Sequence, residues 1–414
     1  MNKTFFILAM LVAGILAGEL IGDAAPILND AASVIGTVWL NALRMTVVPL
    51  VVALLIVGIV QTAAAARAGK IAFTGVVMMI TLLWTSSAIA AFMIPTLTSA
   101  FPIPREAAQA LISGLTTMAP IEQAEPFTEI IKKIVPTNPI GSAANTDVLP
   151  LIVFTLAFAF AVVKLPEDKR RSIHSLFDAV ADAMVMIVGW VLALAPIGVF
   201  ALAYGLGVTA GSAAFGALAH YVIVLVATGS VIWLLSFVIA FAGAGKNPFV
   251  FFRAAIPAQA VAISTQSSLA SLPAMLQGLN QLGVRTRNSE IILPIAVALF
   301  RATGPAMNFG VALYIAHLMG IELTAGQIAL GLAAGAITTM GAVSLPGSIS
   351  FISSIAPICI AMGVPVEPLG LLIAIETFPD IMRTLGNVTM DMAVTATVDK
   401  HVGEDDPAHE GEQS

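Results

Sequence analysis

Five polar residues near the end of the chain have the spacing of one helix face. They are Glu376, Asp380, Arg383, Asn387 and Asp391, and a helix that turns about 100° per residue brings all five within an arc of about 80°. Carboxylates, a guanidinium and a carboxamide together can bind cations, ammonium groups and anionic groups. If the segment lies in a membrane, such ionisable groups are functional candidates by default. Buried ion pairs that only hold helices together are the structural alternative.

The composition indicates that this stripe lies in a membrane protein. Of the 414 residues, 58% are hydrophobic and 10% are charged, whereas about 25% of residues are charged in a typical soluble domain. Apolar stretches close to or above the length of about 18 residues that crosses a bilayer recur along the chain. We therefore predict an all-α polytopic membrane protein. We expect the apolar run after Lys3 to be its first span and not a signal peptide.

Basic residues alternate with the first six apolar stretches, which we place near 4–22, 34–66, 71–95, 148–163, 184–204 and 220–245. They occur before the first stretch and after the second, fourth and sixth, at Lys3, Arg67, Lys70, Lys164, Lys169, Arg170, Arg171, Lys246 and Arg253. Cytoplasmic loops carry an excess of Lys and Arg. The N-terminus and these loops are therefore predicted to be cytoplasmic.

Two later apolar segments, at 262–273 and 336–350, are interrupted at their centres by Ser, Thr, Gly and Pro. Non-helical backbone at membrane depth must be buried in protein or line a polar cavity. We predict that each segment is a re-entrant helical hairpin, with two kinked spans as the alternative. Basic residues flank the first segment on both sides, at Lys246, Arg253, Arg285 and Arg287. This pattern favours a hairpin with both ends in the cytoplasm.

The last predicted helix carries a recognisable pattern. Its residues P-D-I-M-R-T-L-G-N-V-T-M-D, at 379–391, resemble the last transmembrane helix of the dicarboxylate/amino acid:cation symporters, the glutamate transporter family. Further matches occur at 44–51, 138–154, 195–201 and 267–273. The resemblance therefore covers nearly the whole chain.

The resemblance implies eight transmembrane helices and two re-entrant helical hairpins, with inverted repeats, divided between a scaffold and a transport domain. The implied parts are scaffold helices 1–2 at 1–70, transport-domain helix 3 at 71–104, scaffold helices 4–5 at 105–204, transport-domain helix 6 at 205–245, the transport-domain core at 246–400 and a disordered cytoplasmic tail at 401–414. It also implies a homotrimer in the inner (plasma) membrane that works by an elevator-type movement. No cofactor, nucleic acid or enzymatic activity is implied.

A substrate site for aspartate or glutamate is implied as well. Asp380 would hold the amino group of the substrate and Arg383 its side-chain carboxylate, roles that suit a carboxylate and a bidentate guanidinium. Thr384 and Asn387 would complete the pocket. The main carboxylate would be capped from the two hairpin tips, by Ser267, Ser268, Ser344 and Gly347.

One motif departs from the family pattern. Where the family has N-M-D-G-T in its seventh helix, this chain has F-R-A-T-G at 300–304. A hard cation needs several oxygen ligands, which the side chains of Phe300 and Ala302 do not offer. At least one sodium site of the family is therefore expected to be missing. Asn387 and Asp391 are retained, which leaves open a residual sodium site.

We hypothesise that Arg301 substitutes for a bound sodium ion by neutralising Asp391 or its neighbours. Because Arg301 moves with the protein in every step, it supplies no driving force, and we expect protons to do so. Glu376, Asp380 and Asp391 are the candidate proton carriers, since a carboxyl group in a low dielectric holds a proton more readily than in water. An arginine that only contacts cytoplasmic water is the alternative.

Other functions stay open at this stage. The chain could be a sodium-coupled or exchanging transporter of dicarboxylates or other amino acids, or a passive channel, which transport rate and countertransport would distinguish. An intramembrane protease is disfavoured because neither a serine–histidine motif nor a G-x-G-D motif is present.

Overall fold

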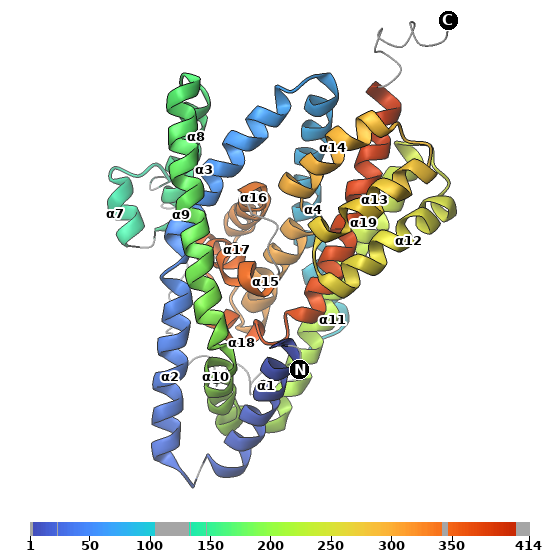
Figure 1. Cartoon of the computed structure of the whole chain (residues 1–414). Helices are drawn as coiled ribbons and strands as arrows, with labels where there is room; N and C mark the ends of the chain where they lie inside the picture. Colours follow the sequence, from blue (N-terminus) through green and yellow to red (C-terminus); the bar gives the residue numbers. More distant parts are fainter. Residues whose placement is uncertain are drawn as a thin grey trace, which may run out of the picture.

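A computed structural model gives the fold of residues 3–22, 24–103, 132, 134–145, 147–341 and 347–402, and these residues form helices without strands. Figure 1 shows the arrangement of the helices. Most of the predicted third loop, the centre of the second predicted hairpin and residues 403–414 of the predicted tail lie outside the described residues. Residues 401 and 402, which we expected in the tail, belong to the last helix.

The first part of the chain forms ten described helical elements, which are α1 (Lys3–Ile21), α2 (Pro26–Arg44), α3 (Val47–Ala66), α4 (Lys70–Ala100), α7 (Pro139–Ala144), α8 (Val148–Val163), α9 (Glu167–Ala193), α10 (Ala195–Ala210), the short 3-10 helix η1 (Gly211–Ala213) and α11 (Ala214–Ala242). The predicted helix at 148–163 is confirmed as α8. The predicted span at 34–66 starts earlier and is divided after Arg44, where the Thr46 hydroxyl donates to the Leu43 carbonyl.

The second part of the chain forms α12 (Pro248–Thr265), α13 (Ser268–Gln281), α14 (Thr286–Leu299), α15 (Gly304–Leu318), α16 (Ala325–Gly341), α17 (Gly347–Met362), α18 (Leu369–Leu372) and α19 (Thr377–Val402). Six helical stretches of the described chain are long and apolar enough to cross a membrane. They are Pro26–Ala66, Lys70–Ala100, Glu167–Ala193, Ala195–Ala242, Pro248–Thr265 and Thr286–Leu318. The all-helical polytopic fold class is confirmed.

Both interrupted segments fold as pairs of helices that pack against each other. Helices α12 and α13 lie side by side at one edge of the molecule (Figure 1) and are joined by two residues. Gln266 closes this turn with a left-handed backbone (φ 52°), and the Ser267 hydroxyl caps α13 by accepting the Ala270 N–H. Helices α16 and α17 form the second pair.

The helices divide into two groups. The first group contains α1, α2, α3, α8, α9 and α10. Helices α1 and α10 approach closely because both carry glycine at the contact. A Cβ atom at Gly18 would lie only 2.1 Å from the carbonyl oxygen of Tyr204, and a Cβ atom at Gly207 would lie 2.1 Å from the carbonyl oxygen of Ile15. The second group contains α4 and α11 to α19, with α3 contacting α16 and α17 across the boundary.

Helix α19 forms the centre of the second group. It packs against α11, α12, α13, α14 and α4, and almost all of its side chains are buried. A helix with several charged residues has therefore been placed in the interior of the bundle. Its polar side must find partners within the protein.

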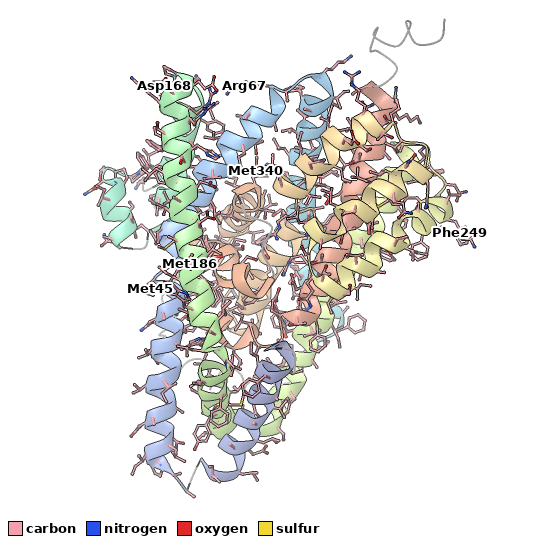
Figure 2. The ribbon with its side chains drawn as sticks, viewed as in Figure 1. Met45, Arg67, Asp168, Met186, Phe249 and Met340 are labelled. Carbon is pink, nitrogen blue, oxygen red and sulfur yellow. The ribbon has the colours of Figure 1, made fainter. Side chains whose placement is uncertain are left out.

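Several of the predicted cytoplasmic loops lie at one end of the molecule. Figure 2 places Arg67 and Asp168 there, where α3 ends and α9 begins, and the C-terminal end of α19 lies at the same end in Figure 1. The Arg67 guanidinium reaches the Val163 carbonyl at the end of α8 (3.4 Å). The alternation of basic residues along the sequence fits this placement.

Candidate functional site

The guanidinium of Arg383 is the centre of the polar site on α19. Its Nη1 atom donates to Glu376 Oε1 (2.5 Å) and to Asp380 Oδ1 (3.0 Å). Asp380 lies three residues before Arg383 on the helix, and Glu376 immediately precedes the helix. All three side chains are buried. The predicted helical spacing therefore brings Asp380 to Arg383, whereas Glu376, which we expected on the same helix, reaches the guanidinium from the turn that precedes it.

The opposite edge of the same guanidinium is unused. Within the described part of the chain, Arg383 Nε and Nη2 are buried and have no hydrogen-bond partner. These two nitrogens lie on one side of the planar group and can bind both oxygens of a carboxylate. A buried donor without a partner is costly. An anionic group bound at this edge would satisfy both donors.

Thr384 directly follows Arg383 on the helix, and Asn387 lies one turn further along. The Asn387 carboxamide oxygen accepts the backbone N–H of Thr303 (2.9 Å) and lies 2.8 Å from the Thr303 hydroxyl. The same hydroxyl lies 2.9 Å from the Arg383 carbonyl oxygen. The Thr384 hydroxyl donates to the Asp380 carbonyl oxygen (3.0 Å). Both predicted pocket residues are therefore buried beside Arg383.

Thr303 belongs to a non-helical break between α14 and α15, at residues 300–303. Phe300 has an extended backbone there, and its side chain is buried. The break corresponds to the F-R-A-T-G segment of the sequence. Thr303 attaches it to α19, a role that was not predicted from the sequence, although the residue lies in the segment that departs from the family pattern.

Arg301 projects from this break and is half-buried. It lies within electrostatic range of Asp380 and Asp391, and also of the like-charged Arg383. Asp391 is fully buried, and neither of its oxygens has a hydrogen-bond partner among the described residues. Arg301 is the cation that acts on this carboxyl group. The described structure thus gathers three acidic and two basic side chains around one region of α19.

The first hairpin is attached to α19 through Thr389, two residues before Asp391. Gln259 Nε2 of α12 donates to the Thr389 hydroxyl (3.0 Å). Ser267 and Ser268, at the tip, are half-buried. Ser267 is engaged in capping α13. Among the described contacts, neither serine hydroxyl bonds to the polar side of α19.

The second hairpin is described only in part. Ser344 lies outside the described residues, and Gly347 is the first residue of α17. A Cβ atom at Gly304 would lie 2.9 Å from Thr339 Cγ2, so α16 packs closely on the start of α15. This contact brings the second hairpin beside the break that carries Arg301.

Tyr221 of α11 is a further member of the site. Its hydroxyl donates to Glu376 Oε2 (3.4 Å), and its ring packs edge-on against Tyr314 of α15, with ring centroids 5.3 Å apart. Both rings are buried. One feature of the sequence could have pointed to Tyr221, a polar tip within an apolar span that requires a partner when buried, but it does not identify that partner.

Comparison with known proteins shows the family of the chain. The model of the sodium:dicarboxylate symporter family matches residues 5–401. The chain is 27% identical to the proton/sodium-glutamate symport protein of Bacillus subtilis, over 98% of this chain and 94% of that protein. It is 25% identical to the proton/glutamate-aspartate symporter of Escherichia coli, over 92% of this chain and 89% of that protein. It is 24% identical to the C4-dicarboxylate transport protein of Anaeromyxobacter dehalogenans, over 97% of this chain and 90% of that protein.

Proposed function

Since the chain belongs to the sodium:dicarboxylate symporter family, whose members are membrane transport proteins and not enzymes, we propose that it is a secondary active transporter of aspartate or glutamate. The observation that carries this proposal is the buried Nε and Nη2 edge of Arg383, which has no hydrogen-bond partner among the described residues and lies beside the carboxylate of Asp380. An acidic amino acid supplies what both groups need, a carboxylate for the guanidinium and an ammonium for the aspartate.

The other predicted residues extend this substrate site. Thr384 and Asn387 lie next to Arg383 on the same helix, where they can bind the polar groups of the substrate. The hairpin tips, through Ser267 and Ser268 in the first and Ser344 and Gly347 in the second, cap the main carboxylate with hydroxyl and backbone N–H groups. Two of the similar proteins are named for symport of glutamate or of glutamate and aspartate, which supports this substrate class.

A dicarboxylate is the second candidate substrate, because one similar protein is named as a C4-dicarboxylate transport protein. A dicarboxylate has no ammonium group. Bound beside Arg383, it would bring its second carboxylate near Asp380 without a cation between them. Asp380 therefore favours the amino acid.

The proposed driving ion is the proton and not sodium. Phe300 and Ala302 offer no side-chain oxygen where the family places sodium ligands. A permanent substitute for a bound sodium ion must lie close to the carboxylates that the ion would neutralise. Arg301 meets this requirement, since it lies within electrostatic range of Asp380 and Asp391. A fixed charge cannot drive a cycle, so protons carried on Glu376, Asp380 or Asp391 are proposed to do so. Sodium coupling through a residual site at Asn387 and Asp391, or exchange of substrates, is the alternative.

The proposed mechanism is an elevator-type movement within a homotrimer in the inner membrane, with both termini in the cytoplasm. The two helix groups support it, since α1 to α3 and α8 to α10 form one group, and α4 and α11 to α19 form another that contains Arg301, Asp380 and Arg383. We propose that the first group is the scaffold and the second the transport domain.

Transport by the purified protein in proteoliposomes tests the proposal. We expect uptake of labelled aspartate or glutamate, driven by an inward proton gradient and unaffected when choline replaces sodium. Uptake that is driven only by a sodium gradient would reject the proposed ion, and transport of succinate without aspartate would reject the proposed substrate. A passive channel would show no countertransport of labelled substrate.

A further inference from the structure

We propose that Glu376 binds the proton that accompanies the substrate, with Tyr221 as the residue that holds its carboxyl group in place; this inference rests on the proposed proton-coupled function. Glu376 is fully buried. Its two oxygens have different partners, Arg383 Nη1 on Oε1 and the Tyr221 hydroxyl on Oε2. The carboxyl group therefore links α19 to α11.

The net charge of the site favours uptake of one proton when substrate binds. Glu376, Asp380 and Asp391 are acidic, and Arg301 and Arg383 are basic, so one negative charge is in excess. An acidic amino acid adds one more, because it carries two carboxylates and one ammonium. A second excess negative charge in a buried site is unfavourable. One proton bound together with the substrate restores the charge of the empty site.

Of the three acidic residues, Glu376 is the one whose protonation acts directly on substrate binding. Asp380 must stay ionised to bind the substrate ammonium. Asp391 lies eight residues beyond Arg383, about 12 Å along the helix axis, and does not contact it. Glu376 shares the guanidinium of Arg383 with the incoming carboxylate. A proton carrier must interact differently with the substrate-loaded and the empty site, and only Glu376 meets this requirement through a direct contact.

The proton transfer is simple to balance. Glu376 Oε2, the oxygen that faces the Tyr221 hydroxyl, takes a proton from a hydronium ion, an O–H bond forms, and a water molecule leaves. Glu376 then no longer forms an ion pair with Arg383. Arg383 Nη1 keeps its hydrogen bond to Asp380, and Arg383 Nε and Nη2 bind the carboxylate of the substrate. Release of substrate on the other side of the membrane reverses these steps, since the guanidinium then attracts the carboxylate again.

The Tyr221 hydroxyl can form a hydrogen bond to Glu376 in both protonation states of the Glu376 carboxyl group. A phenol hydroxyl can donate to a carboxylate and can accept from a carboxylic acid. Tyr221 can therefore keep its contact with Glu376 throughout the cycle, while Arg383 interacts strongly only with the ionised form. The titratable and charged groups that face Glu376 are Tyr221 from α11 and Asp380 and Arg383 from α19, with Tyr314 of α15 behind Tyr221.

Binding of aspartate measured against pH tests the assignment. Between about pH 5 and pH 9, the dissociation constant of the unmodified protein should rise on the alkaline side by up to about tenfold per pH unit, as linkage to one proton requires. Glu376→Gln imitates the protonated residue. It should bind aspartate with a dissociation constant that does not depend on pH, and its uptake should no longer respond to a proton gradient.

The matched control is Glu290→Gln, the same chemical change at an exposed residue of α14, which should keep the pH dependence. If Glu376→Gln keeps the full pH dependence, the assignment to Glu376 is wrong, while proton coupling stands. If the unmodified protein shows neither pH-dependent binding nor proton-driven uptake, the proton coupling of the proposed function fails.

If Glu376→Gln does not fold, the same pH-dependent binding experiment is made with Tyr221→Phe. This variant keeps the ring and removes only the hydroxyl. It should still take up the proton with the substrate, but the pH at which binding is half-maximal should shift. An unchanged pH profile would show that Tyr221 is only a packing residue and would contradict the assignment.

Discussion

The Thr303 hydroxyl lies 2.8 Å from the carboxamide oxygen of Asn387, so the non-helical break between α14 and α15 is attached directly to the polar side of α19. The backbone N–H of Thr303 reaches the same oxygen (2.9 Å). This contact positions Arg301, two residues earlier, beside the acidic groups of the site.

Thr303→Val should weaken aspartate binding by about fivefold to tenfold, since the loss of a buried hydrogen bond costs about 1 kcal/mol. It should also lower the melting temperature. Thr303→Ser keeps the hydroxyl and should bind as the unmodified protein does. Calorimetry and thermal unfolding measure both effects. Equal affinities for the Val and Ser variants would contradict a positioning role for the hydroxyl.

Arg383→Lys should reduce aspartate affinity by about 100-fold, because lysine keeps the charge but loses the planar edge that binds both carboxylate oxygens. Arg383→Ala should abolish recognition of acidic side chains. Competition of labelled aspartate by aspartate, asparagine and serine measures this selectivity. Retained aspartate affinity in the Ala variant would refute the assignment of Arg383.

Arg301→Gln should lower aspartate affinity in sodium-free buffer by about fivefold or more, because a positive charge near buried carboxylates is worth about 1 kcal/mol or more at a moderate effective dielectric. Arg301→Lys should retain most of the affinity. Addition of sodium should not restore binding to the Gln variant, since Phe300 and Ala302 still offer no side-chain ligands. Unchanged binding by Arg301→Gln would show that the arginine has no role in charge compensation.

Arg44 of α2 forms an ion pair with Glu367, which lies between α17 and α18. The pair therefore connects the two helix groups. If one group moves against the other during transport, Arg44→Glu and Glu367→Arg should each change the uptake rate, and the double variant should restore it. Uptake assays with all three variants measure the coupling. Equal effects in the single and double variants would show that the pair does not act across a moving boundary.

The local features of the site could be predicted from the sequence. Helical periodicity is sufficient to place Asp380 and Arg383 on one face, and the structure confirms that they are in contact. Glu376 precedes the helix and reaches Arg383 from the turn before it. The helix at 148–163 could also be predicted, because a continuous apolar run ends there at Lys164. Both features depend on residues that are close in the chain.

The contacts between distant segments could not be predicted in this way. Tyr221 and Glu376 are 155 residues apart, and nothing in their local sequences indicates that α11 packs against α19. The division of the predicted span 34–66 was missed for a different reason. The break after Arg44 depends on a local hydrogen bond from Thr46 that leaves the apolar pattern intact.

Calorimetric titration of aspartate into the purified protein, in choline buffer and again in sodium buffer, tests the central claim most directly. The account predicts saturable binding in choline, with the same affinity in sodium and no binding by Arg383→Ala. Binding that appears only when sodium is present would contradict it, because Arg301 could not then be serving in place of the ion.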